Sequence, residues 1–138
     1  MAAGAGDRGS MLAVSAPLAD LEQLLAEAQF DLVLANRNTP GQGVLSGSSA
    51  EIGRAAAVLE EKGIRCKELS VSAAFHSPLV ADAARPFAEK LGEIAFTAPT
   101  AAVFSNTSGG RYSEKIEEAR ELLAAQLASP VDFVNEIE

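Results

Sequence analysis

Between Met11 and Leu69, short apolar runs alternate with segments of helical periodicity, and this order restricts the fold more than any other feature. Short apolar runs bounded by turn residues predict strands, whereas apolar residues recurring every three or four positions predict helices. We expect strands over residues 11–15, 31–35, 43–46 and 64–69, with helices beginning near Leu18 and Ser48. The resulting order, βαββαβ, is that of a ferredoxin-like domain.

Local signals support this order. Ser48 and Glu51 have the spacing of a capping box at the start of the second helix, and Gly63 is expected to end that helix. The turn-rich segment Asn36–Gln42 lies between two expected strands and contains a Pro-Gly pair. It therefore predicts an antiparallel hairpin.

The second half of the chain is poorer in strand signals. The apolar run ending at Phe75 predicts a buried strand, and Ser77-Pro78 is typical of a helix start. Residues 101–106 predict one more strand, followed by a helix over about 113–128. One strand between two helices cannot close a layered core. We therefore expect this half to be part of a larger α/β domain, and the chain to be a fragment.

The net charge, the cysteine content and the lengths of the apolar runs disfavour several classes of function. A net charge of −8 over 138 residues leaves no basic stripe for a phosphate backbone, so we expect no nucleic-acid partner. The lone Cys66 allows no internal disulfide and no cysteine-based zinc site, which fits a cytoplasmic protein without a bound metal. No apolar run approaches the ~18 residues of a membrane span. Residues 1–10 lack the features of a signal peptide and are interpreted as a linker.

The only histidine, His76, lies where the expected strand passes into a helix. Ligands of α/β proteins often bind at such turns, and histidine titrates closest to neutral pH. Taken alone, a histidine beside a phenylalanine is more often structural than catalytic. A serine hydrolase using Ser77 with His76 is disfavoured, because adjacent side chains on such a turn point apart and Ser77 suits the helix N-cap.

Three segments, in this order and spacing, resemble the acyltransferase domain of polyketide and fatty-acid synthases, the malonyl-CoA:acyl-carrier-protein transacylase family. They are residues 34–42 (LANRNTPGQ) with 45–47 (LSG), residues 74–79 (AFHSPL), and residues 104–106 (FSN) followed by 126–127 (QL) and 129–133 (SPVDF). The resemblance implies an α/β fold in which a ferredoxin-like subdomain, residues 11–70, is inserted into a large α/β-hydrolase-like subdomain. Residues 71–138 would be the C-terminal portion of that large subdomain.

The resemblance also implies a ping-pong acyl transfer without a bound cofactor. A serine accepts a malonyl group from malonyl-CoA and passes it to the phosphopantetheine thiol of an acyl carrier protein. By similarity, His76 is the general base, and the backbone carbonyl of Gln126 orients it. Asn106 is implied to pin the same loop, although it is at least as typical of a turn after a strand, and Asn38 is implied to line the cleft, although it is more typical of a structural turn residue than of a substrate ligand.

Specificity in the family depends on the residues before the histidine. Phenylalanine at the position of Phe75 accompanies malonyl units, because its ring fills the space that an α-methyl group needs. Ala73 stands where many malonyl enzymes have histidine, so the sequence AAFH is closer to iterative synthases of polyene or polyunsaturated type.

The nucleophile motif of the family, Gly-His-Ser-x-Gly, does not occur in the sequence. The arginine that holds the malonyl carboxylate and the N-terminal oxyanion-hole segment have no counterpart either. We therefore expect the isolated chain to be inactive and an N-terminal acyltransferase segment to supply the nucleophilic serine as a partner. The alternative is a non-catalytic, ferredoxin-like interaction module that docks a carrier protein or neighbouring synthase domains, with His76 as a relic.

Overall fold

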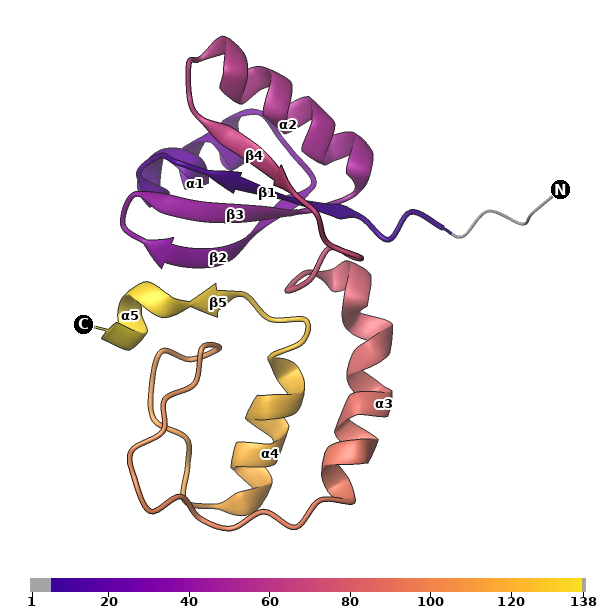
Figure 1. The fold of residues 1–138 in the computed structure, drawn as a ribbon, viewed down its shortest axis with the longest axis vertical. Helices are drawn as coiled ribbons and strands as arrows, with labels where there is room; N and C mark the ends of the chain where they lie inside the picture. Colours follow the sequence, from indigo (N-terminus) through magenta and orange to yellow (C-terminus); the bar gives the residue numbers. More distant parts are fainter. Residues whose placement is uncertain (1–5, 138) are drawn as a thin grey trace, which may run out of the picture.

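The computed structural model describes residues 6–137 and has a mixed α/β architecture. Its first six elements follow the predicted order: β1 (Ser10–Val14), α1 (Leu18–Glu27), β2 (Leu32–Thr39), β3 (Gln42–Gly47), α2 (Ser49–Glu61) and β4 (Cys66–Leu69). The four strands pair antiparallel in the order β4-β1-β3-β2, as in a ferredoxin-like sheet (Figure 1). The ferredoxin-like prediction is confirmed.

Helices α1 and α2 cover one face of this sheet. Leu12, Leu45 and Leu34 lie in register across β1, β3 and β2 and belong to one buried cluster. Leu21 from α1 and Ile52 from α2 pack into the same cluster. The opposite face carries a smaller buried cluster of Met11, Ala35 and Val44. Alternation of side chains along each strand separates the two clusters.

The β2–β3 hairpin is longer than the sequence predicted. Thr39 pairs with Gln42, so only Pro40 and Gly41 form the turn, and Asn36–Thr39 belong to β2. The prediction of a turn was therefore wrong for Asn36–Thr39. The pairing register shifts twice along this stretch, and such bulges let a polar run remain in a ladder.

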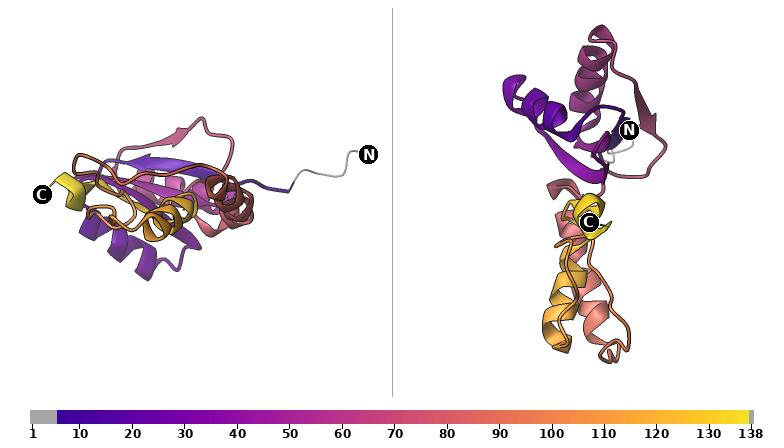
Figure 2. Two further views of the ribbon diagram at one scale, coloured as in Figure 1. Left: turned by 90° about the horizontal axis from the view of Figure 1, so that it is seen from below. Right: turned by 90° about the vertical axis from the view of Figure 1, so that its left-hand side faces the viewer.

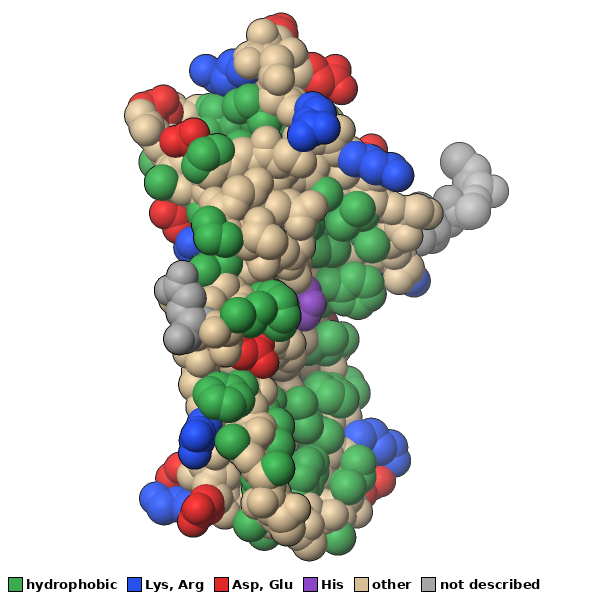
Figure 3. Space-filling model, turned by 60° about the vertical axis from the view of Figure 1, so that its left-hand side comes forward, with side chains coloured by type: hydrophobic (Ala, Val, Ile, Leu, Met, Phe, Trp, Pro, Cys, Tyr) green, Lys and Arg blue, Asp and Glu red, His purple; other side chains and the backbone are tan. Residues whose placement is uncertain are grey.

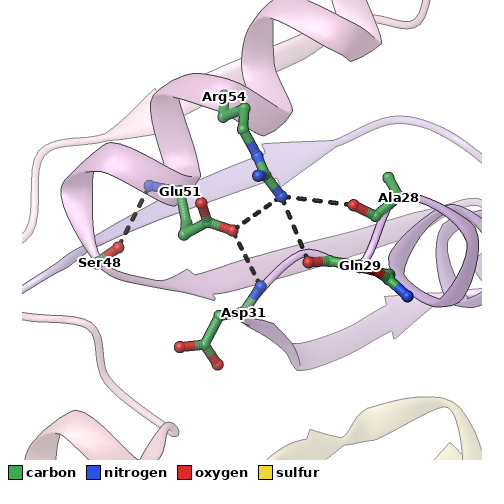
Figure 4. Close-up of polar contacts among 6 residues, drawn as sticks. All are labelled: Ala28, Gln29, Asp31, Ser48, Glu51 and Arg54. Atoms are coloured by element: carbon green, nitrogen blue, oxygen red, sulfur yellow. Dashed lines mark hydrogen bonds and ion pairs between the residues drawn. The ribbon is translucent and has the colours of Figure 1, made fainter.

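The predicted capping box at α2 is only half formed. The Glu51 backbone N–H donates to the Ser48 hydroxyl at 3.3 Å, as predicted. The Glu51 carboxylate instead accepts from the Asp31 backbone N–H at 3.0 Å and pairs with Arg54 at 3.2 Å (Figure 4). Arg54 also reaches two carbonyl groups of the α1–β2 loop. The Glu51 side chain therefore ties α2 to the start of β2.

The second half of the chain is mostly helical. Its elements are the 3₁₀ turn η1 (Pro78–Val80), α3 (Ala81–Gly92), α4 (Ile116–Ala125), β5 (Val131–Asp132) and α5 (Phe133–Ile137). Helices α3 and α4 lie side by side beyond the edge of the sheet (Figures 1 and 2). No helix among residues 6–137 combines the length and the apolar character needed to cross a membrane.

Two predicted strands of this half are not formed. Residues 71–75 contain no strand, because the Ala74 backbone N–H donates to one segment, at Arg8, and the His76 backbone N–H to another, at Leu127. Single bonds to different segments cannot make a ladder. Residues 101–106 contribute only an isolated bridge between Phe104 and Arg111.

Strand β5 was not predicted, and it joins the ferredoxin-like sheet. It pairs parallel with β2, opposite Asn36 and Arg37, and extends the strand order to β4-β1-β3-β2-β5. The division into a linker (1–10), a small subdomain (11–70) and a large portion (71–138) stays a prediction, and the sheet crosses the last boundary. Residues 1–5 of that linker and residue 138 lie outside the described residues.

Leu45 is fully buried between the sheet and its helices. Its truncation should therefore lower the stability of the fold by a large amount. Leu45→Ala should lower the free energy of unfolding by about 2–5 kcal/mol, because a buried methyl-rich side chain is lost and a cavity remains. Ile94 is 52% exposed, so Ile94→Ala is the control and should change stability by less than about 0.5 kcal/mol. Urea denaturation measures both, and equal losses would contradict this core.

Candidate active site

His76 sits on a tightly held loop between β4 and η1. Its φ is 57°, in the left-handed region that residues with side chains rarely adopt. The next residue, Ser77, is buried, donates its hydroxyl to the Ala74 carbonyl at 2.6 Å and accepts from the Leu79 N–H at 3.4 Å. The predicted N-cap role of Ser77 is confirmed. The Ser77 hydroxyl is thus occupied within the loop, which argues against a nucleophilic role.

The imidazole of His76 is oriented by main-chain carbonyl groups. Its Nδ1 lies 3.0 Å from the Gln126 carbonyl oxygen and 3.1 Å from that of Ser129. A carbonyl oxygen only accepts hydrogen bonds, so Nδ1 carries a proton, and in the neutral ring Nε2 therefore holds the lone pair. Among residues 6–137, no hydrogen bond is formed to Nε2. The ring can therefore take a proton from a hydroxyl or thiol brought to Nε2.

Both acceptors lie in the turn that ends α4. The last carbonyl groups of a helix have no partner within the helix, and a histidine side chain can satisfy them. The His76 backbone N–H adds a further bond to the Leu127 carbonyl at 3.2 Å.

The sequence did not point to Ser129 as a neighbour of His76, because a main-chain acceptor leaves no signature in residue type. Gln126, by contrast, lies where the resemblance implied, with its carbonyl on Nδ1. Asn106 is exposed and reaches this region through its backbone, whose carbonyl accepts from the Asp132 N–H at 2.8 Å. The sequence analysis missed Thr107, whose hydroxyl donates to the side-chain oxygen of Gln126.

Phe75 and Ala73 lie directly beside the histidine. The half-buried Phe75 packs against the cluster on the helix-free face of the sheet, and its carbonyl accepts from the Ser46 hydroxyl at 2.9 Å. The Ala73 carbonyl accepts from the Phe75 N–H at 3.0 Å. Asn38 lies on β2, and no hydrogen bond within the described residues joins it to the His76 loop. The structure thus brings Phe75, Ala73 and Gln126 to His76, whereas no hydrogen bond within the described residues joins Asn38 or the Asn106 side chain to the His76 loop.

Residues 7–9, here called the N-terminal strap, fasten the other side of the loop. The Arg8 carbonyl accepts from the Ala74 N–H at 2.8 Å. The Asp7 carboxylate accepts from the Ser49 N–H and hydroxyl and from the Gly9 N–H, and these bonds, above all the one from the Ser49 hydroxyl, lower the pKa of Asp7. The strap therefore joins the start of α2 to the residues before His76.

The surface near His76 is apolar. Figure 3 shows a band of apolar side chains over the lower part of the molecule, with the histidine at its upper end. A groove of about 400 Å³ lies in the second half of the chain. It is lined by Phe96, Thr97, Pro99, Val103, Tyr112, Ala119 and Leu123.

In the part of the chain that is described, no group of three or more His, Cys, Asp or Glu side chains could hold a metal ion.

Comparisons with protein families, with known sequences and with solved structures all point to the same family. The model of the family described as acyl transferase domain matches residues 1–138. One component of the polyunsaturated fatty acid synthase from Thraustochytrium sp. is 34% identical over 132 residues, which are 94% of this chain and 4% of that protein.

Solved structures agree. The malonyl CoA-acyl carrier protein transacylase from Burkholderia pseudomallei has a TM-score of 0.86 and 36% identity, over 95% of this chain and 45% of that one. The acyltransferase domain of an iterative polyketide synthase in enediyne biosynthesis has a TM-score of 0.84 and 32% identity, over 94% of this chain and 34% of that one. The chain therefore spans less than half the length of these relatives.

The strap predicts that Gly9 cannot be replaced without cost. Its φ is 76°, and a Cβ added there would overlap the Gly47 carbonyl oxygen and lie 2.5 Å from the Ala74 Cβ. Gly9→Ala should lower the free energy of unfolding by more than about 1 kcal/mol. The His76 imidazole signals should shift as well, measured by nuclear magnetic resonance.

Gly6→Ala is the matched control, because nothing lies within 4 Å of the added Cβ. Its stability and its imidazole signals should match those of the unchanged chain. If Gly9→Ala behaved like this control, the strap would not hold the loop.

Proposed function

This chain belongs to the acyl transferase domain family, and from that premise we propose that it supplies the catalytic histidine of a malonyl-CoA:acyl-carrier-protein acyltransferase. One observation carries the proposal: His76 Nδ1 is held on two carbonyl oxygens, which leaves a basic Nε2 without a partner among residues 6–137. A positioned base of this kind contributes about 10²–10⁴-fold to proton-transfer reactions.

The proposed reaction has two half-reactions. His76 Nε2 first takes the proton of a serine hydroxyl, the serine oxygen attacks the thioester carbonyl of malonyl-CoA, and coenzyme A leaves as a thiol with the proton from His76. In the second half, His76 deprotonates the phosphopantetheine thiol of an acyl carrier protein. The thiolate attacks the malonyl-serine ester, and His76 returns the proton to the serine.

We propose that the serine belongs to another acyltransferase segment, which packs beside this chain. Support comes from the missing Gly-His-Ser-x-Gly motif and from the occupied hydroxyl of Ser77. The apolar band next to His76 adds to it, because large exposed apolar surfaces are typical of sites covered by a partner. The exposed apolar side chains of this half include Leu79, Phe87, Ile94, Val103 and Phe104.

We further propose that Phe75 selects the malonyl group. Its ring is seated on the helix-free face of the sheet and is adjacent in sequence to His76, so it cannot move far from the base. Ala73, two residues before Phe75, has a smaller side chain than the histidine found at this position in many malonyl enzymes, so it leaves more room beside Phe75. The similarity to the acyltransferase domain of an iterative polyketide synthase supports assignment to an iterative type of synthase.

The role of His76 can be tested by complementation. The chain should be mixed with a separately produced acyltransferase segment that carries Gly-His-Ser-x-Gly, then with malonyl-CoA and an acyl carrier protein. Malonyl loading of the carrier protein, followed by mass spectrometry, should fall about 10²–10⁴-fold for His76→Ala. Glu114→Ala, on an exposed residue, is the control and should load normally.

A different outcome would favour the interaction module. In that case the chain would bind carrier protein equally well with and without His76→Ala, and no mixture would restore loading. Binding measured by calorimetry alongside loading separates the two functions.

The role of Phe75 predicts a change in selectivity. Phe75→Ser should raise the rate of methylmalonyl relative to malonyl loading by about 10–200-fold, the range expected for one methyl group in a pocket. Competition between the two coenzyme A esters measures this ratio in the complemented enzyme. Phe87→Ser, a similar change on α3, is the control, and an unchanged ratio in Phe75→Ser would rule out the selective role.

A further inference from the structure

We propose that Thr107 is a positioning residue, which holds the Gln126 carbonyl on His76 Nδ1 through the Gln126 side chain. The Thr107 hydroxyl donates to Gln126 Oε1 at 2.9 Å in a partly buried contact. The Gln126 carbonyl oxygen lies 3.0 Å from His76 Nδ1. Thr107 and His76 are therefore connected through one residue, which meets Thr107 by its side chain and His76 by its backbone.

The turn that carries Thr107 is a firm support. The Ser105 N–H donates to the Gly110 carbonyl and the Gly109 N–H to the Ser105 carbonyl, both at 2.8 Å. Ser105 is buried, and its hydroxyl accepts from the Thr107 N–H at 3.2 Å. The Asn106 carbonyl also joins this turn to β5. Because the turn is fixed at several points, the Thr107 hydroxyl has a defined position.

Gln126 itself is weakly held by its helix. It follows the last residue of α4, and its N–H reaches the Leu123 carbonyl at 3.3 Å, near the long limit for such a bond. Within residues 6–137, the bond from Thr107 is the one hydrogen bond made by the Gln126 amide, since its Nε2 is shielded from solvent and has no partner there. Removing the Thr107 hydroxyl leaves both polar atoms of the amide without a partner among the described residues, with Nε2 shielded from solvent, which favours a different rotamer.

A change of rotamer at Gln126 acts on the base through its backbone. The single Nδ1 hydrogen is shared between the Gln126 and Ser129 carbonyls. If the Gln126 carbonyl turns away, Nδ1 donates its hydrogen to the Ser129 carbonyl alone. The imidazole ring then changes its orientation, and Nε2 moves. The effect on catalysis rests on the proposed function, whereas the effect on the imidazole does not.

The first test observes the imidazole of the 138-residue chain directly. The chain contains one histidine, so its ring nitrogens give a single pair of ¹⁵N signals in a tag-free sample. Thr107→Val, which keeps the shape and removes the hydroxyl, should shift the Nδ1 and Nδ1–H signals. Thr107→Ser should restore them. Thr100→Val, at an exposed site on the α3–α4 connection, should leave them unchanged.

The second test measures loading in the complemented enzyme. Thr107→Val should lower kcat about three- to tenfold with little change in KM, the size expected for one hydrogen bond. Gln126→Met removes the same bond from its other end and keeps the backbone carbonyl. Since both changes break one interaction, the double variant should lose no more than the larger single loss.

The outcomes separate the two proposals. No loading by the unchanged chain, together with shifted imidazole signals in Thr107→Val, would reject the proposed function and keep the link from Thr107 to His76. Normal loading and unshifted signals in a folded Thr107→Val variant would overturn the positioning role. Additive losses in the double variant would also overturn it, because they would mean that the two side chains act separately.

Discussion

The site depends on one contact, in which the His76 imidazole meets the carbonyl groups that end α4. It joins residues 50 positions apart in the chain. The contact satisfies the carbonyl of Gln126, the C-cap of α4, and that of Ser129 in the following turn, and in the neutral ring it fixes the tautomer that leaves Nε2 basic. In the proposed function, one interaction therefore serves both stability and chemistry. A structural histidine and a catalytic one are usually weighed as alternatives, but here the structural bond is what would prepare the base.

Three segments converge to keep that contact in place. The N-terminal strap holds Ala74 from one side, and the sheet supports Phe75 through the Ser46 hydroxyl. On the other side, β5 pairs with β2 immediately after the turn that contains Ser129. The β2–β5 pairing therefore carries the α4 end toward the histidine loop. The ferredoxin-like sheet acts as a frame for the site, although the histidine lies outside it.

The sequence predicted the elements that rest on local periodicity. The βαββαβ order, the α2 start at Ser48 and the N-cap at Ser77 follow from patterns within a few residues. The predictions that were wrong concern segments whose structure depends on residues far away in the sequence. Residues 71–75 are apolar enough for a strand, but Ala74 bonds to the N-terminal strap and the adjoining His76 to the turn after α4, and Glu51 leaves the capping box for the α1–β2 loop. Strand β5 is too short to show any periodicity, so only its partner β2 defines it.

The same reasoning explains why the surroundings of His76 were only partly foreseen. Gln126 and Ser129 act through backbone oxygens, which every residue possesses, so their identity carries no information about the contact. A carboxylate in that place would be visible in the sequence and could be removed by one substitution. A main-chain acceptor can only be moved, by changing what holds the turn. A substitution can therefore act on such a site only through the side chains that set the direction of the carbonyl groups, and these are polar turn residues that local patterns do not distinguish from ordinary loops.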